Sequence, residues 1–303
     1  MRTAAIDCGT NSIRLLIADV AGGRLTDVAR LMEIVRLGEG VDRTGTLAPE
    51  AIERTRRALL GYAAEIAELG VTAVRMVATS ASRDASNAAD FRAMVRGVLD
   101  VDPEVISGDE EARLSFTGAV RGLAGDPPYL VVDIGGGSTE FVTGRSTTEH
   151  AVSVDVGCVR MTERHLTSDP PTAAEIAAAT ADITAAVDHA LAVVPGREAR
   201  TLVGLAGSVT TVTALALDLP EYDATRIHHA RIGYADVAAV TARLLAATVE
   251  ERRKLPVMHP GRADVIGAGA LILRTVMERS GLPEVVASEH DILDGICYGL
   301  AGE

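Results

Sequence analysis

The sequence predicts an α/β protein built from two domains related by duplication. Its 303 residues exceed the usual size of one domain, so two domains are the expectation. Apolar, β-branched runs alternate with helical patterns along the chain. A segment near residue 3 returns in similar form near residue 129, and such self-similarity is typical of duplicated domains. The predicted domains are residues 1–118 and 119–303, and the last helix could pack back on the first domain.

In the first half, the pattern predicts a hairpin, a third strand and a long helix. The stretches TAAIDCG and SIRLLIADV read as the hairpin, and residues 27–40 as a strand and turn. Residues 48–69 place apolar side chains on one helical face, with Pro49 in the first turn, where proline is tolerated. The remaining predicted elements are a buried strand from residue 71 that runs into a polar loop, a helix near 87–99, a short strand near 104–106 and a helix from residue 108.

The second half begins in the same way as the first. YLVVDIGGGSTEFVTG, 129–144, repeats the design of TAAIDCGTNSIRLLIADV, 3–20: a strand with an aspartate, a glycine turn that ends in serine, and a return strand. The aligned pairs are Asp7 with Asp133, Gly9 with Gly135, Asn11 with Gly137, and Ser12 with Ser138. A third turn, within 202–215, puts Gly204, Gly207 and Ser208 between a strand and a helix. Residues 172–193 and 261–279 read as further helices.

Composition excludes several classes of function. The net charge of −13 argues against broad nucleic-acid binding, which draws on a basic surface. Three scattered cysteines are too few for a disulfide framework or a zinc site. Lys254 is the only lysine, so a Walker A or kinase lysine has almost no candidate. No run approaches 18 continuous apolar residues and no signal-like stretch opens the chain, so we expect a cytoplasmic protein without a membrane partner.

The repeated turns suggest a phosphate site. Glycines let the backbone approach an anion closely, and successive amides form a nest for phosphate oxygens. An aspartate beside such a turn can hold a magnesium ion that bridges to the phosphate. Two such turns facing each other across a cleft would make a site for metal-assisted phosphoryl transfer. A single copy is more often only a tight hairpin, and it is the repetition that favours the phosphate site.

Two segments of the first half add charged candidates. In ISGDEEARLSF, acidic residues open a helix, where the macrodipole favours them. Asp109 is expected to be solvated, and Ser107 with Glu110 fits a capping box, which leaves Glu111 without a local partner. Arg83 follows a buried strand in TSASRDASN, where a loop arginine could contact an anion.

Seven segments in order carry a resemblance to a known family. They are DCGTNSIRLLIADV, ATSASRDASN, ISGDEEARLSFTGAV, VVDIGGGSTEFV, VGCVRMTERH, GLAGSVTTVTAL and HPGRADVIGAGALIL. Together they resemble the short members of the exopolyphosphatase and guanosine pentaphosphate phosphatase family, within the actin, sugar kinase and Hsp70 ATPase superfamily. The resemblance implies two actin-like (ribonuclease H-like) domains that face an interdomain active-site cleft, a magnesium-dependent phosphoanhydride hydrolase, and a homodimer.

The resemblance also implies roles for individual residues. Glu111 would be the general base on the attacking water, and Glu140 would hold that water. Asp133 and Glu140 would serve the metal, with Asp7 as a further carboxylate. The residues that would contact the substrate are Asn11, Ser12, Arg83, Gly135, Gly136, Gly137, Ser138, Thr139, Gly207 and Ser208.

Two polyanions are possible substrates. One is inorganic polyphosphate, cleaved at its terminal phosphate, and the other is guanosine pentaphosphate, cleaved at its 5′-phosphate. A processive polyphosphatase needs a basic track, for which the candidates are Arg30, Arg36, Arg231, Arg252, Arg253, Lys254 and Arg262. A sensor that binds an alarmone or nucleotide without cleaving it is the alternative from another class. Retention of both Glu111 and Glu140 argues against the sensor, because binding alone has no use for a positioned base.

Overall fold

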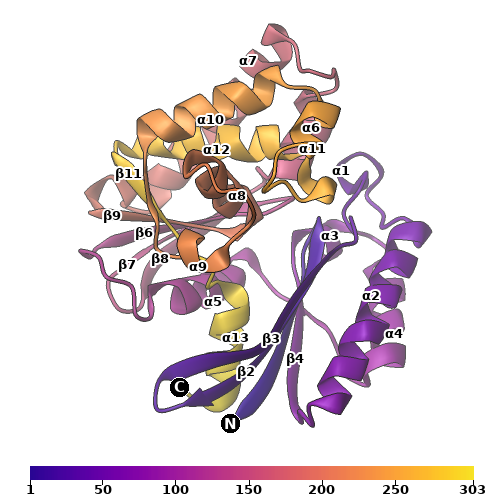
Figure 1. The fold of residues 1–303 in the computed structure, drawn as a ribbon. Helices are drawn as coiled ribbons and strands as arrows, with labels where there is room; N and C mark the ends of the chain where they lie inside the picture. The colour runs from indigo at the N-terminus through magenta and orange to yellow at the C-terminus, as the bar shows by residue number, and fades with distance from the viewer. The chain divides into compact units, whose positions relative to one another are not determined.

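The computed structural model describes residues 1–303, which form two compact units. Unit 1 consists of Met1–Gly118 together with Asp291–Glu303, and unit 2 of Ala119–His290. In Figure 1, the indigo and purple start of the chain and its yellow end therefore belong to the same unit. The expected cleft between the units stays a prediction.

Unit 1 is a five-stranded mixed sheet covered by helices on both faces. Its strands are β1 (Arg2–Cys8), β2 (Ser12–Ala21), β3 (Arg24–Ile34), β4 (Ala73–Ala78) and β5 (Glu104–Val105), in the order β3-β2-β1-β4-β5. Strand β1 pairs antiparallel with β2 and parallel with β4. The helices are α1 (Val41–Thr44), α2 (Pro49–Glu68), α3 (Ser80–Asp84), α4 (Ala88–Leu99), α5 (Gly108–Val120) and α13 (Ile292–Ala301).

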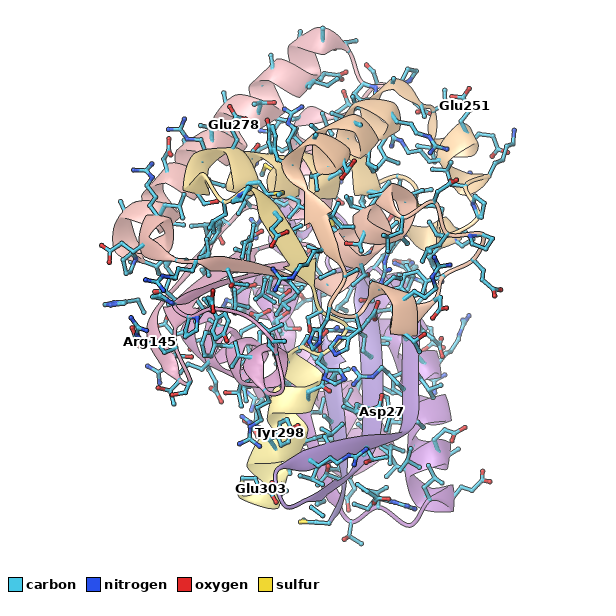
Figure 2. All side chains as sticks on the ribbon, turned by 60° about the vertical axis from the view of Figure 1, so that its left-hand side comes forward. Asp27, Arg145, Glu251, Glu278, Tyr298 and Glu303 are labelled. Atoms are coloured by element: carbon cyan, nitrogen blue, oxygen red, sulfur yellow. The ribbon has the colours of Figure 1, made fainter.

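Because side chains alternate along β1, its residues contribute to two separate hydrophobic cores, one on each face of the sheet. Ala4 and Ile6 face the core under α2 and α4, whereas Ala5 faces the core under α13. Figure 1 shows α2 and α4 side by side and α13 apart from them beside β2. Tyr298, labelled on α13 in Figure 2, is one of the buried residues of that second core. The last helix is therefore an integral layer of the unit that opens the chain.

Unit 2 repeats this sheet with one strand added. Its strands are β6 (Tyr129–Ile134), β7 (Thr139–Gly144), β8 (Thr148–Val154), β9 (Thr201–Leu205), β10 (Arg231–Gly233) and β11 (Glu284–Ala287), in the order β10-β11-β9-β6-β7-β8. Strand β6 pairs antiparallel with β7 and parallel with β9, as β1 does with β2 and β4. Without β10, the order matches that of unit 1 strand for strand. The predicted duplication is confirmed.

The helices of unit 2 are α6 (Cys158–His165), α7 (Ala173–Val193), α8 (Ala206–Ala216), α9 (Ala224–Ile227), α10 (Tyr234–Ala246), α11 (Val249–Arg253) and α12 (Ile266–Ser280), with 3₁₀ turns at Gly196–Glu198 and Pro260–Arg262. Helix α12 is buried along nearly its whole length and contacts α6, α7, α8 and α10. Helix α7 is long and apolar enough to span a membrane by those two criteria, but its inward residues belong to the core of the unit.

Three sequence-based expectations need correction. The polar loop predicted after β4 is the short helix α3, which carries Arg83. The helix predicted from residue 261 begins at Ile266, after a 3₁₀ turn. The capping box on α5 is only half formed: the Glu110 amide donates to the Ser107 hydroxyl at 3.2 Å, but the Glu110 carboxylate accepts a bond from Arg75 at 2.7 Å. The Glu110 side chain therefore pairs with Arg75, which is distant in sequence, instead of completing the local capping box.

The capping box at the start of α7 makes stability depend on pH. The Glu175 carboxylate accepts bonds from the amide of Thr172 and from Thr167 and Ser168, which lower its pKa from 4.5 to about 2. A carboxyl with a lowered pKa stabilises the fold above its ordinary pKa and loses that contribution as the pH falls from 4.5 towards 2. Glu175→Gln should lower Tm at pH 7 and weaken its fall between those pH values. The same change at exposed Glu278 should leave the Tm profile as in wild type.

Candidate active site

The first of the predicted phosphate turns, residues 9–12, joins β1 to β2. The Gly9 amide donates to the Ser12 carbonyl at 3.0 Å, which closes a tight hairpin. The two carbonyls between them point to the segment after β3: Thr10 O accepts from the Gly38 amide at 2.8 Å, and Asn11 O accepts from the amides of Val35 and Arg36 at 3.1 and 2.9 Å. This turn is therefore held from its carbonyl side.

Asp7 has an internal cation as its partner. Arg14 lies opposite Asp7 in the β1–β2 register, and its Nη2 and Nε contact Asp7 Oδ2 at 2.6 and 3.1 Å. Arg14 also forms an ion pair with Asp291, the N-cap of α13. Burial raises the pKa of Asp7, and the Arg14 guanidinium opposes part of that rise. Through its contacts with both Asp7 and Asp291, Arg14 therefore links the first hairpin to the last helix.

Glu111 and Arg83 lie next to each other in unit 1. Arg83 Nη1 is 3.5 Å from Glu111 Oε2 and donates to the carbonyl of Ile106 at 2.9 Å. The Glu111 side chain is 12% exposed, whereas Asp109 is open to solvent and Glu110 pairs with Arg75. Glu111 has a long-range partner, because α3 brings Arg83, 28 residues earlier in the chain, next to it. Three adjacent acids thus have three different environments.

The second phosphate turn joins β6 to β7 and has the same closing bond, from the Gly135 amide to the Ser138 carbonyl at 3.0 Å. All three glycine carbonyls of this turn point to the start of α6. The donors are the amide of Cys158 to Gly135 O (2.9 Å), the amides of Val159 and Arg160 to Gly136 O (2.9 and 3.1 Å), and Arg160 Nε to Gly137 O (2.7 Å). The amides of Gly136 and Gly137 meet no acceptor in the protein.

Asp133 and Glu140 form a buried acid pair beside that turn. They are direct partners in the β6–β7 register, so both side chains lie on one face of the sheet. Asp133 is 8% exposed and Glu140 is 1% exposed. Ser153, the partner of Glu140 on β8, donates its hydroxyl to Glu140 Oε1 at 2.7 Å. Two carboxylates directly opposite each other repel, which makes this position suitable for a bound cation.

The two repeats differ at this one cross-strand position. Asp7 faces Arg14 in unit 1, whereas Asp133 faces Glu140 in unit 2. The residue opposite the first aspartate is therefore a cation, and the residue opposite the second is another acid. No three histidine, cysteine, aspartate or glutamate side chains converge as a metal-ligand set. The protein could supply two carboxylates to a metal at Asp133 and Glu140, with water and substrate completing the shell.

The third turn leads from β9 into α8. Ala206 has φ +66°, a left-handed conformation that is uncommon for a residue with a Cβ. A Cβ on Gly207 would collide with the Arg262 guanidinium in its present position, so the glycine permits the close approach of that cation. The Ser208 hydroxyl bonds with the thiol of Cys158, whose pKa is raised by burial. Through Cys158, the start of α6 contacts both the second turn and the third.

Two predicted contact residues have their side chains engaged internally. The Thr139 hydroxyl is fully buried and donates to the carbonyl of Val156 at 2.5 Å. Ser208 packs so tightly that a Cβ on Gly269 would collide with its Oγ. Asn11 and Ser12 lie in the first turn, and Gly135–Ser138 make up the second. The sequence reading missed Arg14, Ser153 and Arg160, although the register of each hairpin indicates the first two.

The candidate basic track is not supported as a whole. Arg252 is 3% exposed and donates to the carbonyls of Leu244 and Ala263, so it is a structural residue, and its prediction as a track residue is wrong. Four other candidates form ion pairs: Arg231 pairs with Glu284 on the surface, Arg253 and Lys254 pair with Glu250 there, and Arg30 pairs with exposed Asp27 and with buried Asp294. Only Arg36 and Arg262 lie against a phosphate turn.

Comparison with known proteins gives a consistent result. The chain is 52% identical to exopolyphosphatase 2 of Mycobacterium tuberculosis over 315 residues, which covers 99% of each chain. It is 30% identical to the guanosine-5′-triphosphate,3′-diphosphate pyrophosphatase of Pseudoalteromonas atlantica, of which it spans 58%. A crystal structure of an exopolyphosphatase-like protein matches with a TM-score of 0.95 and 45% identity over 97% of this chain and 96% of that one. Residues 16–303 match the model of the Ppx/GppA phosphatase family, and the chain belongs to that family.

Proposed function

We propose that the protein is an exopolyphosphatase, which hydrolyses the terminal phosphoanhydride bond of inorganic polyphosphate and releases orthophosphate. The observation that carries the proposal is the geometry of the second turn, which joins β6 to β7 in unit 2. The amides of Gly136 and Gly137 meet no acceptor in the protein, and a buried acid pair, Asp133 and Glu140, lies beside the turn. The 52% identity to a full-length exopolyphosphatase 2 supports the same activity.

The acid pair fits a magnesium ion. Mg²⁺ is commonly bound by one or two carboxylates together with waters and substrate phosphate oxygens. Asp133 and Glu140 would provide those carboxylates, and the bond from Ser153 would orient Glu140. When bound, the ion would neutralise charge on the transferred phosphoryl group. Asp7 is left out of this set because Arg14, opposite it in the strand register, already pairs with its carboxylate.

Different residues of the chain would then bind the phosphate, orient the attacking water and accept its proton. The amides of the second turn bind the oxygens of the terminal phosphoryl group, which carry the developing negative charge. Glu140 orients the attacking water, and Glu111 accepts its proton as the water attacks phosphorus. Arg83, 3.5 Å from Glu111, holds that carboxylate in place and offers its cation to the phosphate.

A phosphate-release assay on the purified protein tests this proposal. Orthophosphate should appear from polyphosphate when Mg²⁺ is present and should cease when EDTA is added. If nucleotide or polyphosphate binds but no orthophosphate forms at any magnesium concentration, the protein is a sensor, and the proposed activity is wrong.

The 5′-phosphate of guanosine pentaphosphate is the second candidate substrate. The 30% identity to a pyrophosphatase of that alarmone favours it, and so does the absence of a continuous run of unpaired arginines. A processive enzyme on long chains would need such a track. Rates per enzyme on short polyphosphate, long polyphosphate and guanosine pentaphosphate separate the two substrates. We expect short polyphosphate to be cleaved at least as fast as long chains.

We further propose a cytoplasmic homodimer without nucleic-acid or membrane partners. The three free cysteines support a cytoplasmic location. The acidic composition supports the absence of a nucleic-acid partner. Sedimentation at micromolar concentration tests the dimer, and a single species at the monomer mass would exclude it.

A further inference from the structure

In both units, the segment that follows the third strand donates hydrogen bonds to the carbonyls of the phosphate turn. We call residues 35–38 and 157–160 the backing segments of the first and second turns. Residues 158–160 contact the three glycine carbonyls of the second turn, and residues 35–38 contact the carbonyls of Thr10 and Asn11. Thr10 and Asn11 align with Gly136 and Gly137, so the same two peptide units are held in each repeat.

This backing has a direct consequence for the amides. A trans peptide points its C=O and its N–H in opposite directions. Carbonyls that point at the backing segment therefore leave the following amides on the other side of the turn, where those of Gly136 and Gly137 are unengaged. A hydrogen bond at a carbonyl also polarises its peptide unit, so the N–H becomes a stronger donor. The backing segment both orients and strengthens an anion nest.

The two backing segments reach this arrangement with different sequences and elements. Residues 35–38 read VRLG and form a loop, whereas residues 157–160 read GCVR and open α6. Each contains one glycine where a Cβ would collide with the turn: Gly38 against Thr10, and Gly157 against Gly136. Each also contains one arginine, Arg36 and Arg160. The two backing segments differ in sequence but make the same contacts with the turn carbonyls. This indicates that both repeats have retained the contacts and not the sequence.

From these contacts we infer that Arg160 is a positioning residue for the second turn. It is the only residue of its segment whose side chain contacts a turn carbonyl, through the 2.7 Å bond from Nε to Gly137 O. The Gly137 carbonyl belongs to the same peptide unit as the Ser138 amide. A charged donor at that carbonyl polarises the peptide unit more strongly than an uncharged backbone N–H would, so the Ser138 amide becomes the stronger donor. The inference rests on the proposed function, because it assigns the purpose of the polarised amides to phosphate binding in the transition state.

The test uses three variants and one substrate, short polyphosphate. Arg160→Gln removes the charged donor, Arg160→Lys keeps the charge without an Nε, and Arg160→Ala opens space for a small cation. Arg164→Gln is the matched control, because Arg164 lies on the same helix but pairs with Asp182 at 3.0 Å. We expect Arg160→Gln and Arg160→Lys each to lose about 10-fold or more in kcat, since transition-state donors act on that parameter, with KM changed less than about 3-fold. Arg164→Gln should keep the wild-type kcat.

Chemical rescue separates positioning from a structural role. Methylguanidinium at millimolar concentration should restore part of the kcat of Arg160→Ala and leave its Tm unchanged, whereas methylammonium should not restore it. The inference is overturned if Arg160→Gln matches Arg164→Gln, if its loss lies in KM alone, or if rescue fails while Arg160→Ala is folded. A wild-type enzyme that releases no phosphate would instead overturn the proposed function, so the two failures are distinct.

Discussion

Replacing Glu111 with glutamine is expected to reduce the rate of phosphate release by about 1,000-fold, because glutamine cannot accept a proton from the attacking water. The isosteric amide keeps the side-chain volume beside Arg83, so folding should be preserved. The measurement is kcat on short polyphosphate at saturating magnesium, with Tm as the check on folding. Substrate binding should weaken little, since the ground state does not need the base.

The neighbouring glutamate provides the control for this experiment. Glu110→Gln makes the same chemical change one residue away, where the carboxylate pairs with Arg75. It should lose only a small surface ion pair, worth about 0–1 kcal/mol, and keep the wild-type kcat. If Glu110→Gln is the inactive variant and Glu111→Gln is active, the assignment of the base is wrong.

Replacing Asp133 with asparagine should abolish most of the activity and yet stabilise the metal-free protein. Two carboxylates directly opposite each other on neighbouring strands repel, and removing one charge relieves up to about 1 kcal/mol. The same change removes one of the two carboxylates proposed to hold magnesium. We therefore expect Asp133→Asn to raise Tm in EDTA and to lose at least about 100-fold in phosphate release at 1 mM Mg²⁺.

A thermal titration with magnesium gives the clearest comparison. A ligand that binds only the folded state raises stability by about 2.7 kcal/mol at 100 times its Kd, so wild-type Tm should increase with magnesium. Asp133→Asn should show little increase over the same range. Asp236→Asn, an exposed acid in the first turn of α10, should behave as wild type. Equal magnesium responses in wild type and Asp133→Asn would show that the acid pair does not hold the metal.

Local features of this fold could be predicted from sequence, because each is decided by neighbouring residues. Both hairpins are closed by glycine turns of the same length, and counting outward from their closing pairs places Arg14 opposite Asp7 and Glu140 opposite Asp133. The long helix α2 follows from its apolar face and its proline start. Counting the register along each hairpin is therefore enough to identify the asymmetry between the two repeats from the sequence alone.

Long-range contacts could not be predicted in that way. Glu110 fits a local capping box, but Arg75, 35 residues away, binds its carboxylate instead. Arg252 lies in EERRK, which reads as a surface run, yet the fold buries its guanidinium against two backbone carbonyls. Arg83 reaches Glu111 because a stretch expected to be a loop is helical. In each case, a contact between distant segments outweighs the local pattern.

The return of the chain to unit 1 has a consequence for synthesis on the ribosome. The second core of unit 1 lacks its covering helix until α13 has been made, and Arg14 lacks Asp291 for the same time. Unit 2 is a continuous segment and can complete its own core earlier. The first unit to emerge is therefore the last to be finished, and a chain that stops at His290 would expose the apolar face of β1 and β2 that α13 normally covers.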